Sequence, residues 1–349
     1  MIKRLPKSSH GAALITVLII VFIVMTIVTN LTVKNYRVIR RLTNQKVMDQ
    51  CSGILQVAVD FGRAGLATTG STSKIDTLND LWAQPLPQTK IIDDIQMSGY
   101  LIDEQGKFNI NDLTANGQVN QTVLKQFTQL LVYLNIPSAI APNIAYYMAD
   151  PRYQGNIMSQ YTSGNQPYRP SGKPLVDLSE LMLVQGVQPE WVYKLSGYVS
   201  VIPQSINGLL QNQQESGAES GISSTTTPPS PTGTGTVLVN VNTATAEVIA
   251  AKSGIPLPTS QRMTTIRNST PFQSQQDITN FLTSNGIMLS QSSSQGTTTV
   301  NPGTLTTQSN YFTVHAVVDK GDYEFKLVAL LYRANRSGQW PQVLWQHPE

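Results

Sequence analysis

The sequence is poor in the residues that carry most enzyme chemistry. Of its 349 residues, one is a cysteine, Cys51, and three are histidines that lie far apart in the chain: His10, His315 and His347. A single cysteine excludes an internal disulfide and every zinc or redox motif that needs two thiols. The motifs HExxH, GxSxG and GxxxxGKS/T are also missing from the sequence. The sequence therefore favours a structural or binding protein, and we predict that it is not an enzyme.

Charged residues are scarce as well, at 13% of the sequence, about half the usual share. There are 24 Lys and Arg against 21 Asp and Glu, and three of the basic residues, Lys3, Arg4 and Lys7, precede Gly11. A neutral, polar surface without a broad basic face is a poor match for nucleic acid, because phosphate binding depends on clustered positive charge. The hydrophobic fraction of 40% is enough for the two or three units expected of this length.

The longest run without a charge extends from Ala12 to Val33. As a helix these residues would span roughly 33 Å at 1.5 Å per residue, enough to cross the hydrocarbon core of a bilayer. A secretory signal has a shorter apolar region and ends in small residues before its cleavage site. This run instead continues into Lys34, Arg37 and further basic residues. We interpret it as a transmembrane helix that is retained.

Apolar residues continue at three- and four-residue steps beyond the run, at Val47, Cys51, Ile54 or Leu55, Ala58 and Phe61. This spacing predicts an amphipathic helix. One helix of about 50 residues, half in lipid and half on a globular domain, explains both segments. Cys51 then lies on the buried stripe.

The remaining chain alternates between strand-like and helical patterns. Residues 95–111 contain two extended runs about Gly106 and predict a hairpin, and residues 311–333 predict two strands joined at Lys320–Asp322. The sequence between these two regions has helical patterns, interrupted by Ser-, Thr-, Pro- and Gly-rich tracts. The pattern predicts an α+β fold in which one antiparallel sheet packs on the long N-terminal helix and helical units are inserted between its hairpins.

A basic leader ending in glycine, followed by an apolar helix with an amphipathic continuation, resembles type IV prepilins and pseudopilins. Four further segments resemble the type II secretion system protein K family: "GKFNINDL" (106–113), "KPLVDLSELMLVQGV" (173–187), "VNVNTATAEVIAA" (239–251) and "FTVHAVVDKGDYEFKLVALLYR" (312–333). The resemblance implies a single-pass inner-membrane protein with its bulk in the periplasm. It further implies a complex with minor pseudopilins I and J, next to other inner-membrane components, that starts or caps the pseudopilus for export of folded proteins across the outer membrane.

The resemblance also implies specific residues at the N-terminus. A prepilin peptidase would cleave between Gly11 and Ala12 on the cytoplasmic face. Most of the class has glutamate at the fifth mature position, where it neutralises the terminal amine of a neighbour, whereas this sequence has Thr16. A missing carboxylate is expected in the one subunit that has no subunit ahead of it.

The expected organisation follows from these patterns. We predict a leader peptide (1–11), a transmembrane helix (12–33), the pseudopilin helix with a first hairpin (34–112) and a first helical domain (113–206). A flexible linker (207–236), a second, helix-hairpin-helix-like unit (237–289), a further linker (290–307) and a C-terminal hairpin that completes the sheet (308–349) follow.

Calcium is a cofactor that the resemblance implies, in acidic loops of the first helical domain. The candidate ligands are Asp150, Asp177 and Glu180, although the segment around Asp150 carries fewer acids than the family usually has there. Asp177 and Glu180 have a second interpretation, since Asp-Leu-Ser-Glu is also typical of a helix N-terminus.

Two alternative functions start from the same sequence. Residues 239–282 also resemble the helix-hairpin-helix of DNA-uptake proteins, but the hairpin contains Pro256 and Pro258, which lack the N–H groups that grip phosphate. The other alternative is a membrane-anchored periplasmic substrate receptor outside any pilus. Such a receptor would keep its N-terminus uncut.

Overall fold

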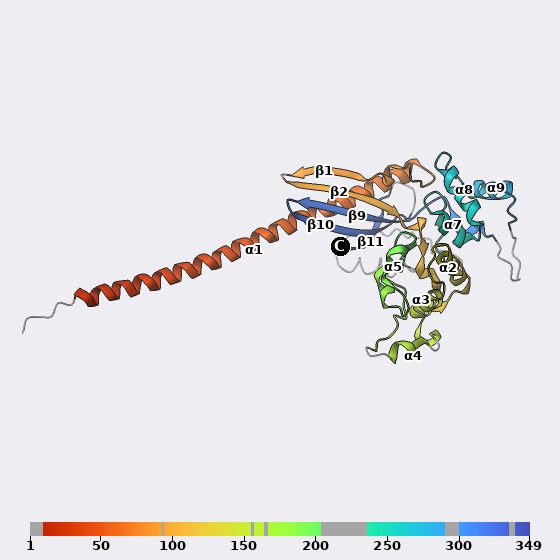
Figure 1. Ribbon diagram of the computed structural model, residues 1–349. Coiled ribbons are helices and arrows are strands. Elements are labelled where there is room, and N and C mark those ends of the chain that lie inside the picture. Colours follow the sequence, from red (N-terminus) through yellow and green to blue (C-terminus); the bar gives the residue numbers. More distant parts are fainter. Residues whose placement is uncertain are drawn as a thin grey trace, which may run out of the picture.

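The computed structural model describes residues 10–92, 94–154, 157–163, 167–203, 236–289, 300–334 and 339–349, with the side chains of residues 10–12 left out. Figure 1 shows one long helix, α1, whose N-terminal half projects from a head made of a sheet and several short helices. The sheet lies along the second half of α1, and the helices lie at the far end of the sheet.

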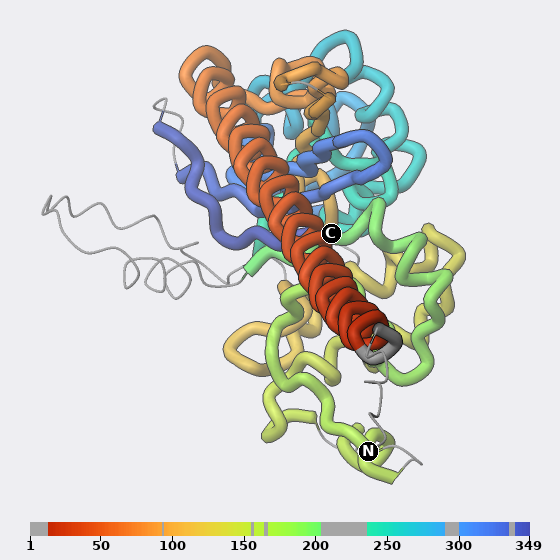
Figure 2. Tube along the Cα trace, turned by 90° about the vertical axis from the view of Figure 1, so that its left-hand side faces the viewer, coloured from red at the N-terminus to blue at the C-terminus, as the bar shows by residue number. Residues whose placement is uncertain are grey.

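Helix α1 extends from His10 to Thr72, a length of 63 residues or about 95 Å. It is longer than the sequence predicts. It continues without a break from the projecting half into the half that packs on the head (Figure 2). Every side chain from residue 13 to residue 46 is exposed. The hydroxyls of Thr26, Thr29 and Thr32 each donate to the carbonyl four residues earlier, so these polar side chains are satisfied within the apolar part of the helix.

Five strands form one antiparallel sheet in the order β1-β2-β9-β10-β11. Their bounds are Leu86–Ile92, Ile95–Asp103, Tyr311–Lys320, Tyr323–Tyr332 and Gln342–Pro348. Strand β2 pairs with β9 in a register that runs from Ile95 opposite Lys320 to Asp103 opposite Phe312. Strands separated by about two hundred residues are thus neighbours, as the predicted inserted architecture requires.

The hairpin that the sequence predicts about Gly106 is wrong. The hairpin partner of β2 is β1, which lies in a stretch whose prolines and polar residues are typical of loops. An edge strand tolerates such residues, because only one of its sides has to pair. After β2 the chain forms a 3-10 turn, η2 (Glu104–Gly106), and β3 (Phe108–Asn109) pairs in parallel with β6 (Val199–Ser200).

The second half of α1 covers one face of the sheet and forms the sheet core with it. Cys51, Leu55 and Val59 of α1 are buried against alternate residues of β9. These are the apolar residues that the alternation pattern singles out: Phe312, Val314, Ala316 and Val318. Trp82, in the 3-10 turn η1 (Leu81–Ala83), packs edge-on against Phe312 with ring centroids 5.1 Å apart. The core is closed by side chains from both ends of the chain.

The helical part contains seven α-helices within the described residues: α2 (Gln121–Tyr133), α3 (Ile140–Met148), α4 (Ile157–Thr162), α5 (Pro189–Leu195), α7 (Ala246–Ser253), α8 (Leu257–Arg267) and α9 (Gln275–Ser284). Three 3-10 turns accompany them: η3 (Ile110–Leu113), η4 (Pro151–Tyr153) and η5 (Leu178–Leu183). A short hairpin joins β4 (Thr114–Ala115) to β5 (Gln118–Val119).

The two helical units have one hydrophobic core in common. Buried side chains form a single cluster that extends from Phe108 to Leu305, here called the helical core, and α2 packs directly against α7. The sequence pattern divides these residues into separate ranges, because the tract between them is poor in apolar residues. The packing instead makes one body of residues 108–202 and 239–305.

The two tracts predicted as linkers lie largely outside the described residues, which omit 204–235 and 290–299. The described end of the second tract is structured. It contains η6 (Pro302–Thr304) and β8 (Leu305–Thr306), and β8 pairs in parallel with β7 (Val239–Asn240). Leu305 is buried in the helical core, which explains why the chain is ordered before β9 begins.

Candidate assembly site

The N-terminal half of α1 presents a long apolar surface that the head leaves uncovered. Large side chains from Leu14 to Val33 are between 44% and 70% exposed. This is the one helix in the described residues that is long and apolar enough to cross a membrane. It fits a single-pass membrane anchor.

The predicted cleavage position lies at the beginning of this helix. The backbone of Gly11 and Ala12 belongs to α1, while their side chains and residues 1–9 of the leader lie outside the described residues. Thr16, at the fifth position after the predicted cut, donates its hydroxyl to the carbonyl of Ala13 at 2.9 Å. Its polar group is used inside its own helix, so it resembles the other threonines of the span. Cleavage and the meaning of Thr16 stay predictions.

The three candidate calcium ligands have other partners. Arg152 donates two hydrogen bonds to Asp150, at 2.9 and 3.0 Å, and this lowers the pKa of Asp150 to about 2. Asp177 and Glu180 form a capping box at η5, in which Asp177 accepts from the N–H of Ser179 and Glu180 accepts from the N–H of Asp177.

These contacts describe an ion pair and a helix cap. Calcium requires six to eight oxygen ligands, several of them anionic. In the described part of the chain, no three His, Cys, Asp or Glu side chains are grouped so that they could hold a metal ion. The oxygen ligands that these three residues offer do not fit a calcium site.

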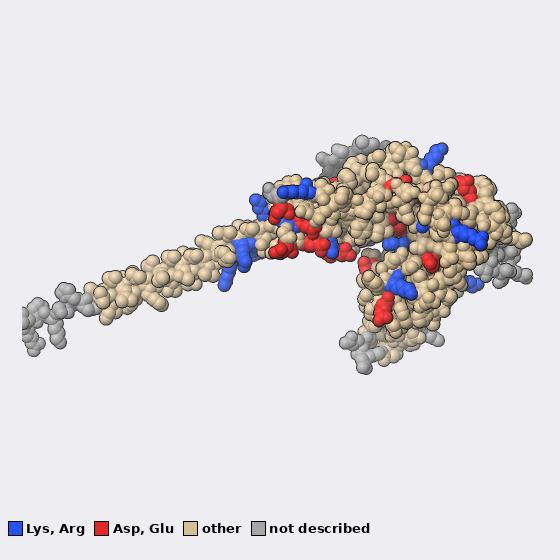
Figure 3. Space-filling view, turned by 45° about the horizontal axis from the view of Figure 1, so that its top comes forward, with Lys and Arg blue, Asp and Glu red and all other residues tan. Residues whose placement is uncertain are grey.

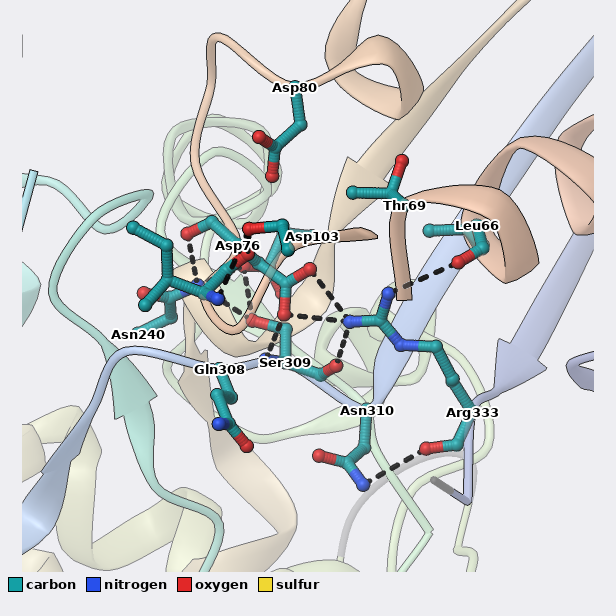
Figure 4. A network of polar contacts seen from close by, with 12 residues as sticks. Leu66, Thr69, Asp76, Asp80, Asp103, Asn240, Gln308, Ser309, Asn310 and Arg333 are labelled. Carbon is teal, nitrogen blue, oxygen red and sulfur yellow. Dashed lines mark hydrogen bonds and ion pairs between the residues drawn. The ribbon is translucent and has the colours of Figure 1, made fainter. Parts of the chain in front are cut away.

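A buried cluster of polar side chains, here called the polar junction, joins the sheet to α1 and to the helical part (Figure 4). Its members are Asp76, Asp103, Asn240, Thr243, Ser309 and Arg333. The guanidinium of Arg333, at the end of β10, bonds both carboxylate oxygens of Asp76 at 2.7 Å. It also donates to the carbonyls of Ser309, at 2.7 Å, and of Leu66 in α1, at 3.3 Å. The side chain of Arg333 therefore connects the end of β10 to α1 and to the loop that follows α1.

Asp103 is the second carboxylate of the polar junction. It lies at the end of β2 and accepts hydrogen bonds from the hydroxyls of Ser309 and Thr243, each at 2.6 Å, and from the amide of Asn240 at 3.2 Å. Burial raises the pKa of Asp103 to about 6, against the opposing effect of these hydrogen bonds, and the charge of Asp76 raises it further. The junction thus holds two carboxylates against one guanidinium.

A second buried ion pair holds the helical part together. Lys252 of α7 lies 2.8 Å from Asp112 in η3, and both side chains are 1% exposed. Asp112 also accepts from the amide of Asn109 at 2.8 Å and from the N–H of Val237 at 2.9 Å. The ammonium of Lys252 lies 5.0 Å from the centre of the Phe108 ring. Burial raises the pKa of Asp112, and Lys252 opposes that shift.

Two asparagines of the sequence motifs form hydrogen bonds with backbone groups of distant loops. In "GKFNINDL", Asn111 accepts from the N–H of Leu175 and donates to its carbonyl, and also donates to the carbonyl of Ile202. In "VNVNTATAEVIAA", Asn242 makes the same pair of bonds with Phe272. Amides that pair with distant backbone groups fix how loops meet, so these motifs describe architecture rather than a reactive centre.

Sequence reasoning missed the polar junction. Two of its three charged members are single residues at the ends of apolar strands, Asp103 as the last residue of β2 and Arg333 directly after β10, while Asp76 lies in the loop after α1. A charge placed where a buried strand ends is the signal that could have found them. Their pairing over 257 positions from Asp76 to Arg333 leaves no local pattern.

The helix-hairpin-helix-like unit offers little to a nucleic acid. Of the three basic residues near its hairpin, Lys252 is buried against Asp112, and Arg267 donates to the carbonyls of Val241 and Ala244. Burial lowers the pKa of Arg267 to about 10. Arg262 is exposed, and it bonds the side chain of Asn285 at 3.3 Å. The unit is built for packing, since phosphate binding needs several exposed positive groups.

Comparison with known proteins agrees with these features. The family model described as type II secretion system (T2SS), protein K, matches residues 106–204. Type II secretion system protein K of Pseudomonas aeruginosa is 27% identical over 341 residues, which cover 94% of this chain and 90% of that protein. The crystal structure of the GspK-GspI-GspJ complex from the enterotoxigenic Escherichia coli type 2 secretion system contains a chain of the same fold. The TM-score is 0.63 at 19% identity, over 88% of this chain and 99% of that chain.

The match of the family model begins at the first motif residue, Gly106, and ends at residue 204, two residues before the predicted end of the first helical domain. The curated relative extends the similarity over nearly the whole chain. The resemblance to type II secretion system protein K, a minor pseudopilin with one apolar N-terminal helix, is thereby confirmed.

Proposed function

We propose that the chain is the minor pseudopilin at the tip of a type II secretion pseudopilus. There it starts or caps the filament together with minor pseudopilins I and J, and so serves the export of folded proteins across the outer membrane. It works as a structural subunit and not as an enzyme. The solved complex in which one chain has the same fold also contains proteins named GspI and GspJ. This supports partners of that kind for this chain.

The observation that carries the proposal is the free half of α1. A helix that is apolar and exposed from residue 13 to residue 33, continuous with a helix buried on a sheet, can be held by a membrane and then by other helices. The same geometry supports a location in the inner membrane, with the head in the periplasm.

Thr16 supports the tip position. A carboxylate buried among apolar helices is stable when a neighbour's terminal amine compensates it, and costly when nothing does. Thr16 satisfies its hydroxyl within α1 and needs no partner from another subunit. A subunit with threonine here can precede the others without leaving a charge uncompensated.

The processing step provides the experiment. We expect prepilin peptidase to cut between Gly11 and Ala12, because glycine precedes the step from polar to apolar sequence there. Gly11→Val should block the cut and abolish secretion in a strain that lacks its own protein K. The measurements are the mass of the N-terminus and the amount of exported protein in the medium.

Gly53→Val is the matched control. It places the same side chain in the same helix, at a position where an added Cβ meets no atom within 4 Å. That variant should be processed normally. Detection of Met1 on functional protein isolated from membranes would overturn the proposal in favour of an uncut receptor.

A further inference from the structure

A short basic segment follows the apolar run of α1 directly. Lys34, Arg37, Arg40 and Arg41, here called the basic neck, lie between the last residue of the run, Val33, and the beginning of the head. All four side chains are exposed. Figure 3 shows Lys and Arg side chains gathered on the helix between its uncharged stretch and the head. The chain has no acidic residue between Ala12 and Met48.

The helix places these charges on one side. Lys34, Arg37 and Arg41 are three and four positions apart, so they share one face, and Arg40 follows Arg37 by three. Ile39 and Leu42, three positions apart, fall on the other side of the helix, where they are more than half exposed. The neck is thus an amphipathic continuation of the span, with separate basic and apolar faces.

The neck also has no partner of its own among the described residues. None of its four basic side chains forms an ion pair there. The nearest acid along α1, Asp49, lies about 12 Å beyond Arg41 at 1.5 Å per residue. Arg40 lies over the ring of Tyr36, 5.6 Å from its centre, and the ring is 60% exposed. Four positive charges are therefore available to an external anion.

The position of the neck identifies that anion. We propose that the basic neck binds the phosphates of anionic phospholipid headgroups and so fixes the depth of α1 in the membrane. This inference rests on the membrane anchoring in the proposed function. Lys34 to Arg41 spans about 10 Å of helix directly outside a run that fills the hydrocarbon core, so the neck begins in the headgroup layer, which is about 5–8 Å thick on each side, and reaches its outer surface. Tyrosine is typical of the same layer.

Two charge arguments favour lipid over a second protein. Lys and Arg normally concentrate on the cytoplasmic side of a span, so four of them on the outer side require a role in the inserted protein. The end of the head nearest the neck carries many Asp and Glu side chains (Figure 3). They include Asp49 and the hairpin-tip residues Asp94, Asp319, Asp322 and Glu324. Lys46, Lys90, Lys320 and Lys326 lie at the same end and nearly balance these five acids, so the neck, and not the head, supplies the attraction to an anionic surface.

Lipid binding by the full chain, as isolated from membranes, tests the inference. Native mass spectrometry in detergent measures the affinity for phosphatidylglycerol and for phosphatidylcholine with the same acyl chains. We expect a preference for phosphatidylglycerol that weakens with salt. Replacing Lys34, Arg37, Arg40 and Arg41 with Gln should reduce the preference at least about fivefold, the factor for loss of a single charge.

The matched control removes four exposed basic residues of the helical part. Lys125, Arg169, Lys173 and Lys194, changed to Gln, give the same change in net charge far from the span. That variant should keep the preference. An unchanged preference in the neck variant, an equal loss in the control, or crosslinks from the neck to acidic pseudopilin surfaces without any lipid preference would each overturn the inference.

The experiments distinguish a failure of the lipid inference from a failure of the proposed function. If the wild-type chain supports secretion and co-purifies with pseudopilins I and J, yet shows no lipid preference, only the lipid inference is wrong. If the wild-type chain shows the lipid preference but does not support secretion, the proposed function is wrong and the neck is still a lipid-binding segment.

Discussion

The helical core and the sheet core are assembled from the chain in opposite ways. The helical core takes its side chains from Phe108 to Leu305, one stretch of sequence between β2 and β9. The sheet core combines residues from Cys51 to Met97 with residues from Phe312 to Leu331, on either side of that stretch. The helical part can therefore form from local segments, whereas the sheet cannot close until both ends of the chain are present. A long insertion adds little to the cost of that closure, because the cost grows only with the logarithm of its length.

The two buried ion pairs repeat the contrast. Asp112 and Lys252 balance one another within the helical core. Asp76 and Arg333 join segments from either side of the insertion, and Asp103 brings a second carboxylate into the same buried cluster, close enough to Asp76 for their charges to interact. A balanced pair should depend little on pH near neutrality, whereas an unbalanced one should depend on it.

Removing residues 308–349 should separate the two cores. The deletion takes away β9, β10 and β11 together with Arg333, so β2 loses its partner and α1 loses the sheet. We expect limited proteolysis of the truncated protein, with its N-terminal helix intact and in detergent, to cleave residues 86–103 rapidly. Residues 108–202 and 239–305 should stay resistant, because their core is complete. Wild-type resistance around residues 95–103 would show that the sheet does not need its C-terminal half.

Arg333→Met should be the most damaging single substitution considered. It leaves Asp76 buried without its counter-charge, at a cost of about 3–5 kcal/mol. Thermal unfolding followed by tryptophan fluorescence measures the loss, since Trp82 lies in the sheet core. Lys326→Met, on the same strand, removes an exposed ion pair with Glu324 and should change nothing measurable. Equal midpoints for the two variants would contradict a supporting role for the polar junction.

Lys252→Met should destabilise the helical core by about 3 kcal/mol, because Asp112 keeps only its bonds from Asn109 and Val237. Adding Asp112→Asn removes the stranded charge and retains an acceptor, so the double variant should be more stable than the single one. Denaturant unfolding of these two variants, of Asp112→Asn alone and of the wild type measures the coupling. Additive losses would mean that the two side chains do not interact.

Asp103→Asn should change how stability depends on pH. The folded protein holds the proton of Asp103 with a pKa of about 6, above the ordinary 3.8, so this group binds protons more tightly in the folded state than in the unfolded state. Its contribution to stability is therefore largest near pH 4 and is lost as the pH rises through 6.

The asparagine variant lacks this contribution. Relative to wild type it should gain about 1–3 kcal/mol between pH 4 and pH 7. Thermal unfolding of both proteins across that range measures the difference. Parallel pH profiles would show that the carboxyl of Asp103 does not titrate with folding.

Several features were predictable because they depend on residues that are close in sequence. The apolar N-terminal run, the buried stripe from Cys51 to Ala58, the alternation in 312–318 and the α+β class all follow from local sequence pattern, although Phe61, the predicted end of the stripe, is 58% exposed. The strand pairing across the insertion was predictable in outline, since each hairpin alone is too small to be stable. The position of Gly11 and the identity of Thr16 can be read directly from the sequence.

Tertiary structure decided the features that depend on distant partners. Residues 86–92 form an edge strand because they pair with β2. Leu305 of β8 is buried because it packs in the helical core. The meeting of Asp76, Asp103 and Arg333 required the sheet to close first. By itself the sequence determined which segments would be apolar, helical or extended, because those properties follow from local periodicity. Which of them would be neighbours was decided by burial, because each apolar face must find another face, wherever that face lies in the chain.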